Sequence, residues 1–232
     1  MKNKAFLKAF KTSIPVLCGY LTLGIAFGLF LINANYSWWL SPLMSLIMYA
    51  GAAQFIGIGL FVAGMPLSTI LITQALVNIR HIVYGFSLIN KYKKSGKWKP
   101  YLIFALTDET YSLVTSTDLD KDIDSVKFYG YVSLLNHIYW VTGSTLGSLL
   151  GNFIPFDFAG VDFSLTALFA VLTVEQFLKT KDISPILTGS ISTIAAIILM
   201  KFGIIQSSNI LLLALFAGIL IILFIKRSKK NA

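Results

Sequence analysis

Hydrophobic segments long enough to cross a membrane follow one another along almost the whole chain, and they limit the possible folds more than any other feature. A transmembrane helix needs about 20 mostly apolar residues. Only 12% of the 232 residues are charged, about half the share of an ordinary soluble domain. We therefore predict an all-α, polytopic integral membrane protein with seven or eight helical segments, some of them broken or re-entrant. The hydrophobic stretches cover approximately residues 14–32, 42–63, 66–90, 101–117, 128–153, 160–178, 184–202 and 208–225.

The basic residues are concentrated where a membrane protein faces the cytoplasm. The net charge is +9, and most of it lies at the two ends of the chain and in the loop 91–99. Lysine and arginine accumulate in cytoplasmic loops, so this distribution indicates a lipid bilayer, and not nucleic acid, as the partner of the basic residues. We expect both termini in the cytoplasm. The residues concerned are Lys2, Lys4, Lys8, Lys11, Lys91, Lys93, Lys94, Lys97, Lys99, Lys226, Arg227, Lys229 and Lys230.

The loop 91–99 creates a conflict for a chain that simply crosses the membrane eight times. Eight crossings place both termini inside, but they place this lysine-rich loop outside, against the positive-inside rule. The conflict disappears for the central loops if the third segment, 66–90, is re-entrant or broken, because irregular backbone is allowed at membrane depth where protein or a cavity surrounds it. A similar break in the seventh segment, 184–202, keeps both termini inside. The sequence leaves both topologies open.

A weak internal repeat divides the chain into two halves. At a constant offset of 119 residues, Gly24 matches Gly143 and Gly28 matches Gly147, and one lysine, one tyrosine, one proline, one threonine and one isoleucine position match as well. Many transporters consist of two such halves with the substrate site between them. We therefore expect a single transmembrane transporter domain over residues 1–232, with pseudo-repeats at about 8–117 and 127–226.

Polar and charged residues interrupt the third segment near its middle, at Asn78, Arg80 and His81. A charge exposed to lipid at mid-depth costs a few kcal/mol or more, so this part of the segment must look into protein or water. The first acids in the chain are Asp108 and Glu109, which directly follow an apolar run. We predict that the two stretches face each other and line a transport path.

Two structural alternatives compete with a transport role for these residues. Arg80 and one of the acids can form a permanent ion pair that only holds two segments together. If a helix begins at Thr107, acids in its first turn are also favoured by the positive end of the helix dipole. The position of Asp108 and Glu109 after six apolar residues favours a break in a membrane segment over an exposed helix start.

The stretch Tyr49–Phe55 combines small residues with a glutamine in the middle of the second segment. A locally unwound helix there would offer free backbone groups, and such broken helices bind amino-acid substrates in other transporters. We therefore count Gly51 and Gln54 as candidate substrate contacts. The alternative is a close helix contact of small residues with Gln54 bonded across it, and the sequence favours neither.

Residue sets for catalysis or metal binding are missing from the sequence. The two histidines and the single Cys18 have no metal-ligand spacing, and there is no phosphate-binding glycine loop and no nucleophile motif. We expect neither an enzyme nor a bound cofactor or metal.

Five short motifs together carry a family resemblance. They are Gly24–Gly28, Tyr49–Gln54, Asn78–Gly85, Thr107–Glu109 and Trp140–Gly147. This set resembles the AzlC-type large subunits of branched-chain amino-acid exporters, the azaleucine-resistance family, over nearly the whole chain. The resemblance implies a protein of the bacterial inner membrane that works with a small hydrophobic AzlD-type subunit. It also implies export of leucine, isoleucine and valine, in some cases methionine.

Under this resemblance we assign roles to the polar residues of the third and fourth segments as hypotheses. Arg80 would hold the α-carboxylate of the substrate, since a guanidinium binds carboxylates in a bidentate way. Asp108 or Glu109 would bind the α-ammonium or exchange a coupling proton with His81, and Asn78 would add a substrate contact. Two other classes stay open: a transporter or channel for another small solute such as an organic acid, and a membrane scaffold subunit that transports nothing.

Overall fold

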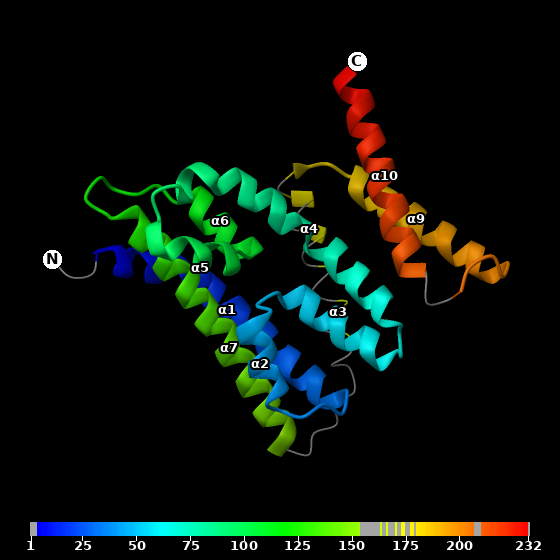
Figure 1. Cartoon of the computed structure of the whole chain (residues 1–232), viewed down its shortest axis with the longest axis horizontal. Helices are drawn as coiled ribbons and strands as arrows, with labels where there is room; N and C mark the ends of the chain where they lie inside the picture. Colours follow the sequence, from blue (N-terminus) through cyan, green and yellow to red (C-terminus); the bar gives the residue numbers. More distant parts are fainter. Residues whose placement is uncertain are drawn as a thin grey trace. The chain divides into compact units, whose positions relative to one another are not determined.

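The computed structural model describes residues 4–153, 163, 166, 170, 173–174, 177–178, 180–206 and 210–231. These residues form helices, turns and loops, and no strand occurs among them, as the predicted all-α class requires. Of the described helices, α1 and α9 are long and apolar enough, by length and composition alone, to cross a membrane. The elements (Figure 1) are α1 Lys4–Asn33, α2 Leu40–Ile47, α3 Gly51–Val62, α4 Leu67–Tyr92, the 3-10 turn η1 Gly96–Trp98, α5 Lys99–Phe104, α6 Asp108–Ser116, α7 Ser125–Phe153, α9 Ser184–Lys201 and α10 Ile210–Asn231.

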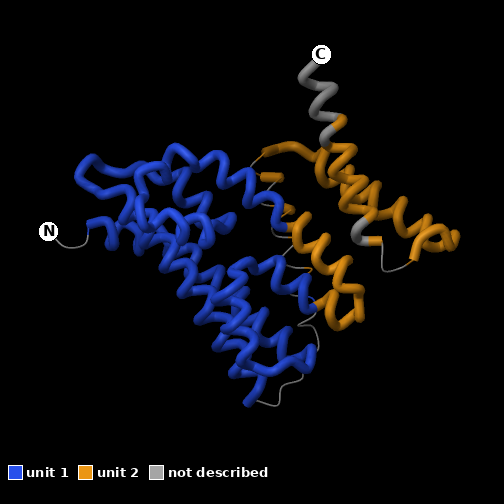
Figure 2. Tube along the Cα trace, viewed as in Figure 1, with its two compact units in different colours: residues 1–58, 78–165 blue, residues 59–77, 166–232 orange. Residues whose placement is uncertain are grey.

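The chain divides into two compact units (Figure 2). Unit 1 contains residues 1–58 and 78–165, and unit 2 contains residues 59–77 and 166–232. Within unit 2, α9 and α10 pack together, and a Cβ atom added at Gly218 would lie 3.3 Å from Ser192 Oγ. All candidate site residues of the sequence analysis belong to unit 1.

Helices α1 and α7 pack side by side and run parallel in unit 1 (Figure 1). Glycines allow the contact: a Cβ atom added at Gly28 would lie 2.3 Å from the backbone of Ser144, and one added at Gly147 would lie 2.1 Å from the Ile25 carbonyl oxygen. Small residues are what lets membrane helices approach this closely. Gly28 and Gly147 are also matched by the predicted repeat.

The second hydrophobic segment is broken near its middle. Tyr49, between α2 and α3, has a positive φ of 43°, which bulky residues rarely adopt. Before the break, α2 runs antiparallel to α7, because Ser41 Oγ donates to the Ser144 carbonyl at 2.8 Å while Tyr49 stacks on His137 with ring centroids 4.2 Å apart. The backbone break expected as one alternative for this stretch is therefore present.

After the break, α3 turns back toward the C-terminal end of α1. Gly51 lies against the Trp140 indole, and a turn later the Phe55 ring packs on Phe27 with centroids 5.3 Å apart. We call α2 and α3 the first helical hairpin. The hairpin starts at the C-terminal end of the α1–α7 pair, bends at Tyr49 beside the middle of α7, and turns back toward the same end.

The fourth hydrophobic segment forms a second helical hairpin, α5 and α6, which enters from the opposite end. The chain first runs along α7 in the same direction as that helix: Trp98 lies against Gly130, and the Tyr101 hydroxyl is 3.2 Å from His137 Nδ1. It bends between α5 and α6, and α6 then runs back and places Val114 in the core near the start of α1. The predicted break in this segment is confirmed.

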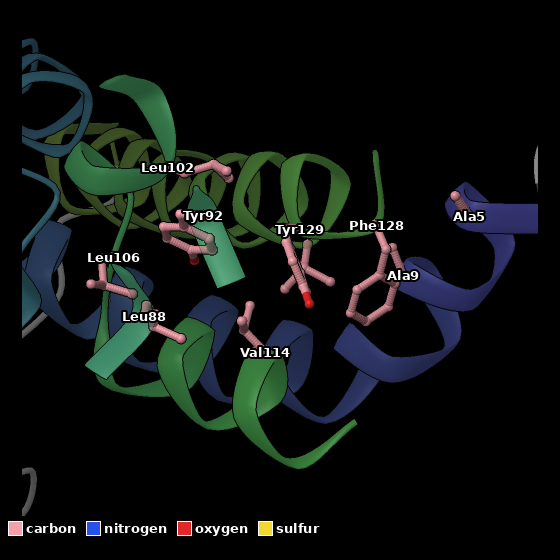
Figure 3. Close-up of a cluster of buried hydrophobic side chains, with 10 residues drawn as sticks. Ala5, Ala9, Leu88, Tyr92, Leu102, Leu106, Val114, Phe128 and Tyr129 are labelled. Atoms are coloured by element: carbon pink, nitrogen blue, oxygen red, sulfur yellow. The ribbon is translucent and has the colours of Figure 1, made fainter. Parts of the chain in front are cut away.

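A hydrophobic core fixes the end of unit 1 where α1 and α7 begin (Figure 3). It joins the last turns of α4 to both hairpin arms α5 and α6, and Lys91 Nζ donates to the Val114 carbonyl at 2.7 Å. The loop 91–99 therefore lies at the same end as the start of α1. The core residues are Ala5, Ala9, Leu88, Tyr92, Leu102, Leu106, Val114, Phe128, Tyr129 and Val132.

The same end carries an exposed ion pair between Lys4 and Asp122, in the loop before α7. The Lys4 ammonium holds the pKa of the Asp122 carboxyl below its ordinary value. The pair adds a second tie between the start of α1 and the start of α7, although exposed pairs contribute little to stability.

The third segment differs from one expectation. α4 is a continuous helix from Leu67 to Tyr92, so a break within the third segment is wrong, and the seventh segment, α9, is also continuous. The breaks fall in the second and fourth segments instead. Most of the sixth segment, 160–178, lies outside the described residues.

Candidate functional site

The centre of the candidate site is an ion pair between α4 and the first turn of α6. Arg80 Nη1 lies 2.5 Å from Asp108 Oδ2. The side chains are 34% and 24% exposed, so the pair is partly buried. The predicted contact between the third segment and the acids is confirmed, with Asp108 as the partner.

This ion pair uses only part of the bonding capacity of either group. Arg80 Nε and Asp108 Oδ1 are both buried, and neither has a hydrogen-bond partner among the described residues. An unmet donor or acceptor away from water typically costs about 1–3 kcal/mol. One unpaired donor and one unpaired acceptor therefore belong to the two members of the same ion pair.

Asp108 and Glu109 are neighbours in sequence, but they face different helices. The sequence folds this way because Thr107 caps α6: its side-chain oxygen accepts from the Thr110 backbone N–H at 3.3 Å. The helix then turns Asp108 toward α4 and Glu109 toward α1. The Tyr20 hydroxyl of α1 lies 2.6 Å from Glu109 Oε2 and 2.7 Å from Thr107 Oγ1.

Further polar side chains continue this cluster into α7. Thr110 Oγ1 lies 3.1 Å from Thr107 Oγ1 and accepts from Asn136 Nδ2 at 3.0 Å. The amide oxygen of Asn136 is buried without a hydrogen-bond partner among the described residues. We call Tyr20, Thr107, Glu109, Thr110 and Asn136 the carboxylate cluster.

Gln54 lies in a second buried network that is linked to the first by aromatic contacts. Its Oε1 accepts from Trp140 Nε1 at 2.8 Å and its Nε2 donates to Ser45 Oγ at 3.1 Å. Trp140 also packs edge-on against Tyr20, with centroids 5.5 Å apart. The helix is therefore broken, as the first alternative for this stretch requires, and Gln54 is bonded across the contact, as the second requires; contact of Gly51 and Gln54 with the substrate stays a prediction.

Gly51 is required by the same tryptophan. A Cβ atom added at Gly51 would lie 2.9 Å from Trp140 Cη2, so a larger residue would displace the indole that bonds Gln54. Gly51 and Gln54 thus hold Trp140 in place from the first turn of α3.

The His81 side chain bonds to the backbone of its own helix. His81 Nδ1 lies 3.1 Å from the Asn78 carbonyl oxygen in the preceding turn of α4, and its ring packs edge-on against Tyr84. Tyr84 in turn stacks on Tyr111 of α6, with centroids 4.4 Å apart. The aromatic stack joins α4 to α6 one turn below Arg80 and Asp108.

Several residues of the site were not predicted to belong to it. Tyr20 lies in an apolar stretch, Thr110 directly follows the two acids and Asn136 precedes His137, and nothing in their local sequence shows that they converge on Glu109. Only their presence at mid-segment, where a polar group needs a partner, is a signal. Among the described residues, no group of three histidine, cysteine or acidic side chains is arranged to hold a metal ion.

Comparison with known proteins places the chain in a family. The family described as AzlC protein matches residues 15–154. The branched-chain amino acid transport protein AzlC of Bacillus subtilis strain 168 is 37% identical over 195 residues, which cover 84% of this chain and 77% of that protein. The chain belongs to the AzlC family.

Other AzlC-family relatives are known as membrane proteins. A membrane protein of Helicobacter pylori strain 26695 is 38% identical over 225 residues, 97% of this chain and 96% of that protein. The inner membrane protein YgaZ of Escherichia coli K12 is 27% identical over 192 residues, 78% of this chain and 77% of that protein. No solved structure matches the chain.

Proposed function

We propose that this chain is the large subunit of a two-component exporter that moves leucine, isoleucine and valine, with methionine as a further candidate substrate, out of a bacterial cell across the inner membrane. Family membership supports transport, and the name of the Bacillus subtilis relative supports branched-chain amino acids as the substrate class. The second component is a small hydrophobic subunit of the AzlD type. The activity is transport and not an enzymatic reaction, and no cofactor takes part.

The observation that carries this proposal is the incompletely bonded Arg80–Asp108 pair. A free amino acid is a zwitterion with a carboxylate and an ammonium on the same carbon. Its carboxylate matches the unpaired Arg80 Nε–H, and its ammonium matches the unpaired Asp108 Oδ1. The substrate can therefore bind by completing the bonds of the two residues that face each other in its absence.

Specificity for the side chain is proposed to be loose. The α-carboxylate and the α-ammonium of the substrate make the polar contacts, while its aliphatic side chain contacts apolar residues. One methylene in such an environment discriminates by about 1–3 kcal/mol, so several similar amino acids should pass. Asn78, Gly51 and Gln54 support this site, the first from α4 and the other two by holding Trp140. His81, Asp108 and Glu109 are the candidates for exchanging a coupling proton.

The two helical hairpins support a definite membrane topology. We propose that α1, α4 and α7 cross the membrane, that the first hairpin enters from outside and that the second enters from inside. Residues 67–92 form one helix of about 39 Å at about 1.5 Å per residue, which is enough to cross. The loop 91–99 then lies in the cytoplasm with the N-terminus, as the positive-inside rule requires, and the basic C-terminus follows the same rule.

We propose that the repeat relates α1 and α7 by an approximate two-fold axis that runs parallel to both helices. Matched helices α1 and α7 are parallel and meet through matched glycines, since Gly28 contacts Ser144 and Gly147 contacts Ile25, which is matched to Ser144. Reciprocal contacts of this kind are what a two-fold axis produces. The whole chain then forms one transporter domain, with pseudo-repeats at about 8–117 and 127–226.

The test is efflux of labelled leucine and valine from cells that express this chain with and without a small hydrophobic protein of the AzlD type. We expect efflux only when both are present. Arg80→Ala and Asp108→Asn should reduce it to background while the protein still reaches the membrane. Asp122→Asn, which removes an exposed carboxylate from the Lys4 pair, is the matched control and should transport normally. Efflux at the control level from either site variant contradicts the proposed roles.

A further inference from the structure

We infer that Glu109, bonded to the Tyr20 hydroxyl, is the group that binds and releases a proton during transport, separately from the Arg80–Asp108 pair that holds the substrate. The inference rests on the proposed function for the transported amino acid. It narrows three candidate proton carriers to one residue and adds Tyr20, Thr107 and Thr110 as its relay.

The surroundings of the two neighbouring acids separate their roles. Asp108 is bound to a guanidinium that never loses its proton in proteins, so its charge is matched by a permanent cation. Among the described residues, no lysine, arginine or histidine nitrogen lies within 4 Å of the Glu109 carboxylate; its close polar partner is the neutral Tyr20 hydroxyl. A carboxyl group without a cation can exist in either protonation state.

The hydroxyl chain next to Glu109 fits both protonation states without moving any heavy atom. When Glu109 is ionised, Tyr20 donates to Oε2 and Thr107 donates to Tyr20. When Glu109 carries a proton, it donates to Tyr20, Tyr20 donates to Thr107, and Thr107 donates to Thr110. The oxygen–oxygen separations of 2.6, 2.7 and 3.1 Å allow a hydrogen bond in either direction along the chain.

The far end of the chain has a fixed direction. The Asn136 amide nitrogen donates to Thr110 Oγ1, and the Thr110 backbone N–H donates to Thr107 Oγ1, so both threonine oxygens keep one permanent donor in each state. Each threonine therefore still has a lone pair and a hydrogen of its own for the reversible part of the chain. Asn136 anchors the relay to α7.

The titratable groups that face Glu109 leave it as the one group that exchanges a proton. Tyr20 faces it from α1, Tyr49 from the tip of the first hairpin, and Asp108 is its neighbour on α6. Both tyrosines are buried phenols, which stay protonated at neutral pH. His81 is turned toward its own helix backbone, so it is a poorer carrier.

The proposed step is a simple proton transfer. A hydronium ion loses a proton and becomes water, an O–H bond forms on Glu109 Oε2, and the hydrogens of Tyr20 and Thr107 turn toward the next oxygen. The reverse step releases the proton on the other side. No electron is transferred, so no oxidant or reductant is needed.

Two measurements on the full chain with its partner subunit in liposomes test this inference. Glu109→Gln keeps the size and the hydrogen bond to Tyr20 but cannot bind a proton. We expect labelled leucine counterflow within about twofold of the wild type, whereas the stimulation of net transport by an imposed pH gradient is lost. Tyr20→Phe, which interrupts the relay, should reduce the stimulation and spare counterflow.

The second measurement does not depend on transport. Infrared difference spectra recorded between high and low pH should show the carbonyl band of a protonated carboxylic acid in the wild type and in the control Asp122→Asn, with a buried component missing in Glu109→Gln. If the wild type moves no leucine but this component titrates, the proposed function fails and the proton site stands. If Glu109→Gln keeps the component, or still responds to the pH gradient, the inference is overturned.

Discussion

The Arg80–Asp108 pair can serve the fold, the transport path or both, and reversing its charges separates these roles. Arg80→Asp and Asp108→Arg each leave two like charges together in a half-buried place. We expect each single change to cost about 2 kcal/mol, between the cost typical of exposed and of buried ion pairs. The double variant restores an ion pair between α4 and α6, so its thermal stability in detergent should return close to that of the wild type.

Leucine efflux should not return in the double variant. The guanidinium and the carboxylate then lie on exchanged helices. A zwitterion can match them only in the reversed orientation, with its side chain pointing the opposite way. Efflux at the wild-type level together with restored stability would assign the pair a purely structural role.

The contact of a single residue could be predicted where a charged side chain at membrane depth has few possible partners. Arg80 at mid-segment needs a counter-charge, and the first acids available are at 108 and 109, so the contact could be predicted. Which of the two acids pairs with Arg80 could not be predicted, because the choice depends on the rotation of α6, and the Thr107 cap sets this rotation. The convergence of Tyr20, Thr110 and Asn136 on Glu109 depends on tertiary packing and leaves no local pattern.

At the scale of elements, the contact between α1 and α7 depends on a few glycines. Gly147→Ala would place a methyl group 2.1 Å from the Ile25 carbonyl oxygen, where only backbone can yield. We expect a loss of about 1–3 kcal/mol from overpacking, measured as a lower melting temperature of the purified protein. Gly28→Ala, its match in the repeat, should behave alike.

Gly19→Ala is the matched control, because a Cβ atom there meets nothing within 4 Å. Alanine is the better helix former by about 1 kcal/mol, so this variant should be as stable as the wild type or slightly more stable. Equal melting temperatures for the Gly147 and Gly19 variants would contradict the close packing of α1 on α7.

The positions of the helix breaks show what sequence patterns can and cannot locate. Small residues after Tyr49 and the Thr107–Glu109 motif indicated breaks, and both are present. A break in the third segment was one of two topologies that the lysine distribution left open; α4 is continuous, and Arg80 reaches Asp108 of α6 without unwinding the helix. Charge counts constrain which side a loop occupies but not which segment turns back.

At the scale of the whole molecule, labelling of single cysteines distinguishes the three possible topologies. In a Cys18→Ser background, the informative positions are Met65, Lys97 and Asp120, each in a different loop. Hairpins at α2–α3 and α5–α6 place residue 65 outside and residues 97 and 120 inside. Eight full crossings place 65 and 120 inside and 97 outside, whereas a re-entrant third segment places 65 and 97 inside and 120 outside.

We expect a membrane-impermeant maleimide added to intact cells to label Met65→Cys and to spare Lys97→Cys and Asp120→Cys. Inside-out vesicles should give the opposite pattern. Asn35→Cys and Lys4→Cys are controls, since all three topologies place the first outside and the second inside. Because Met65 lies outside only when the second segment turns back, protection of this cysteine in intact cells, with Asn35→Cys labelled, would rule out the first helical hairpin as a re-entrant element.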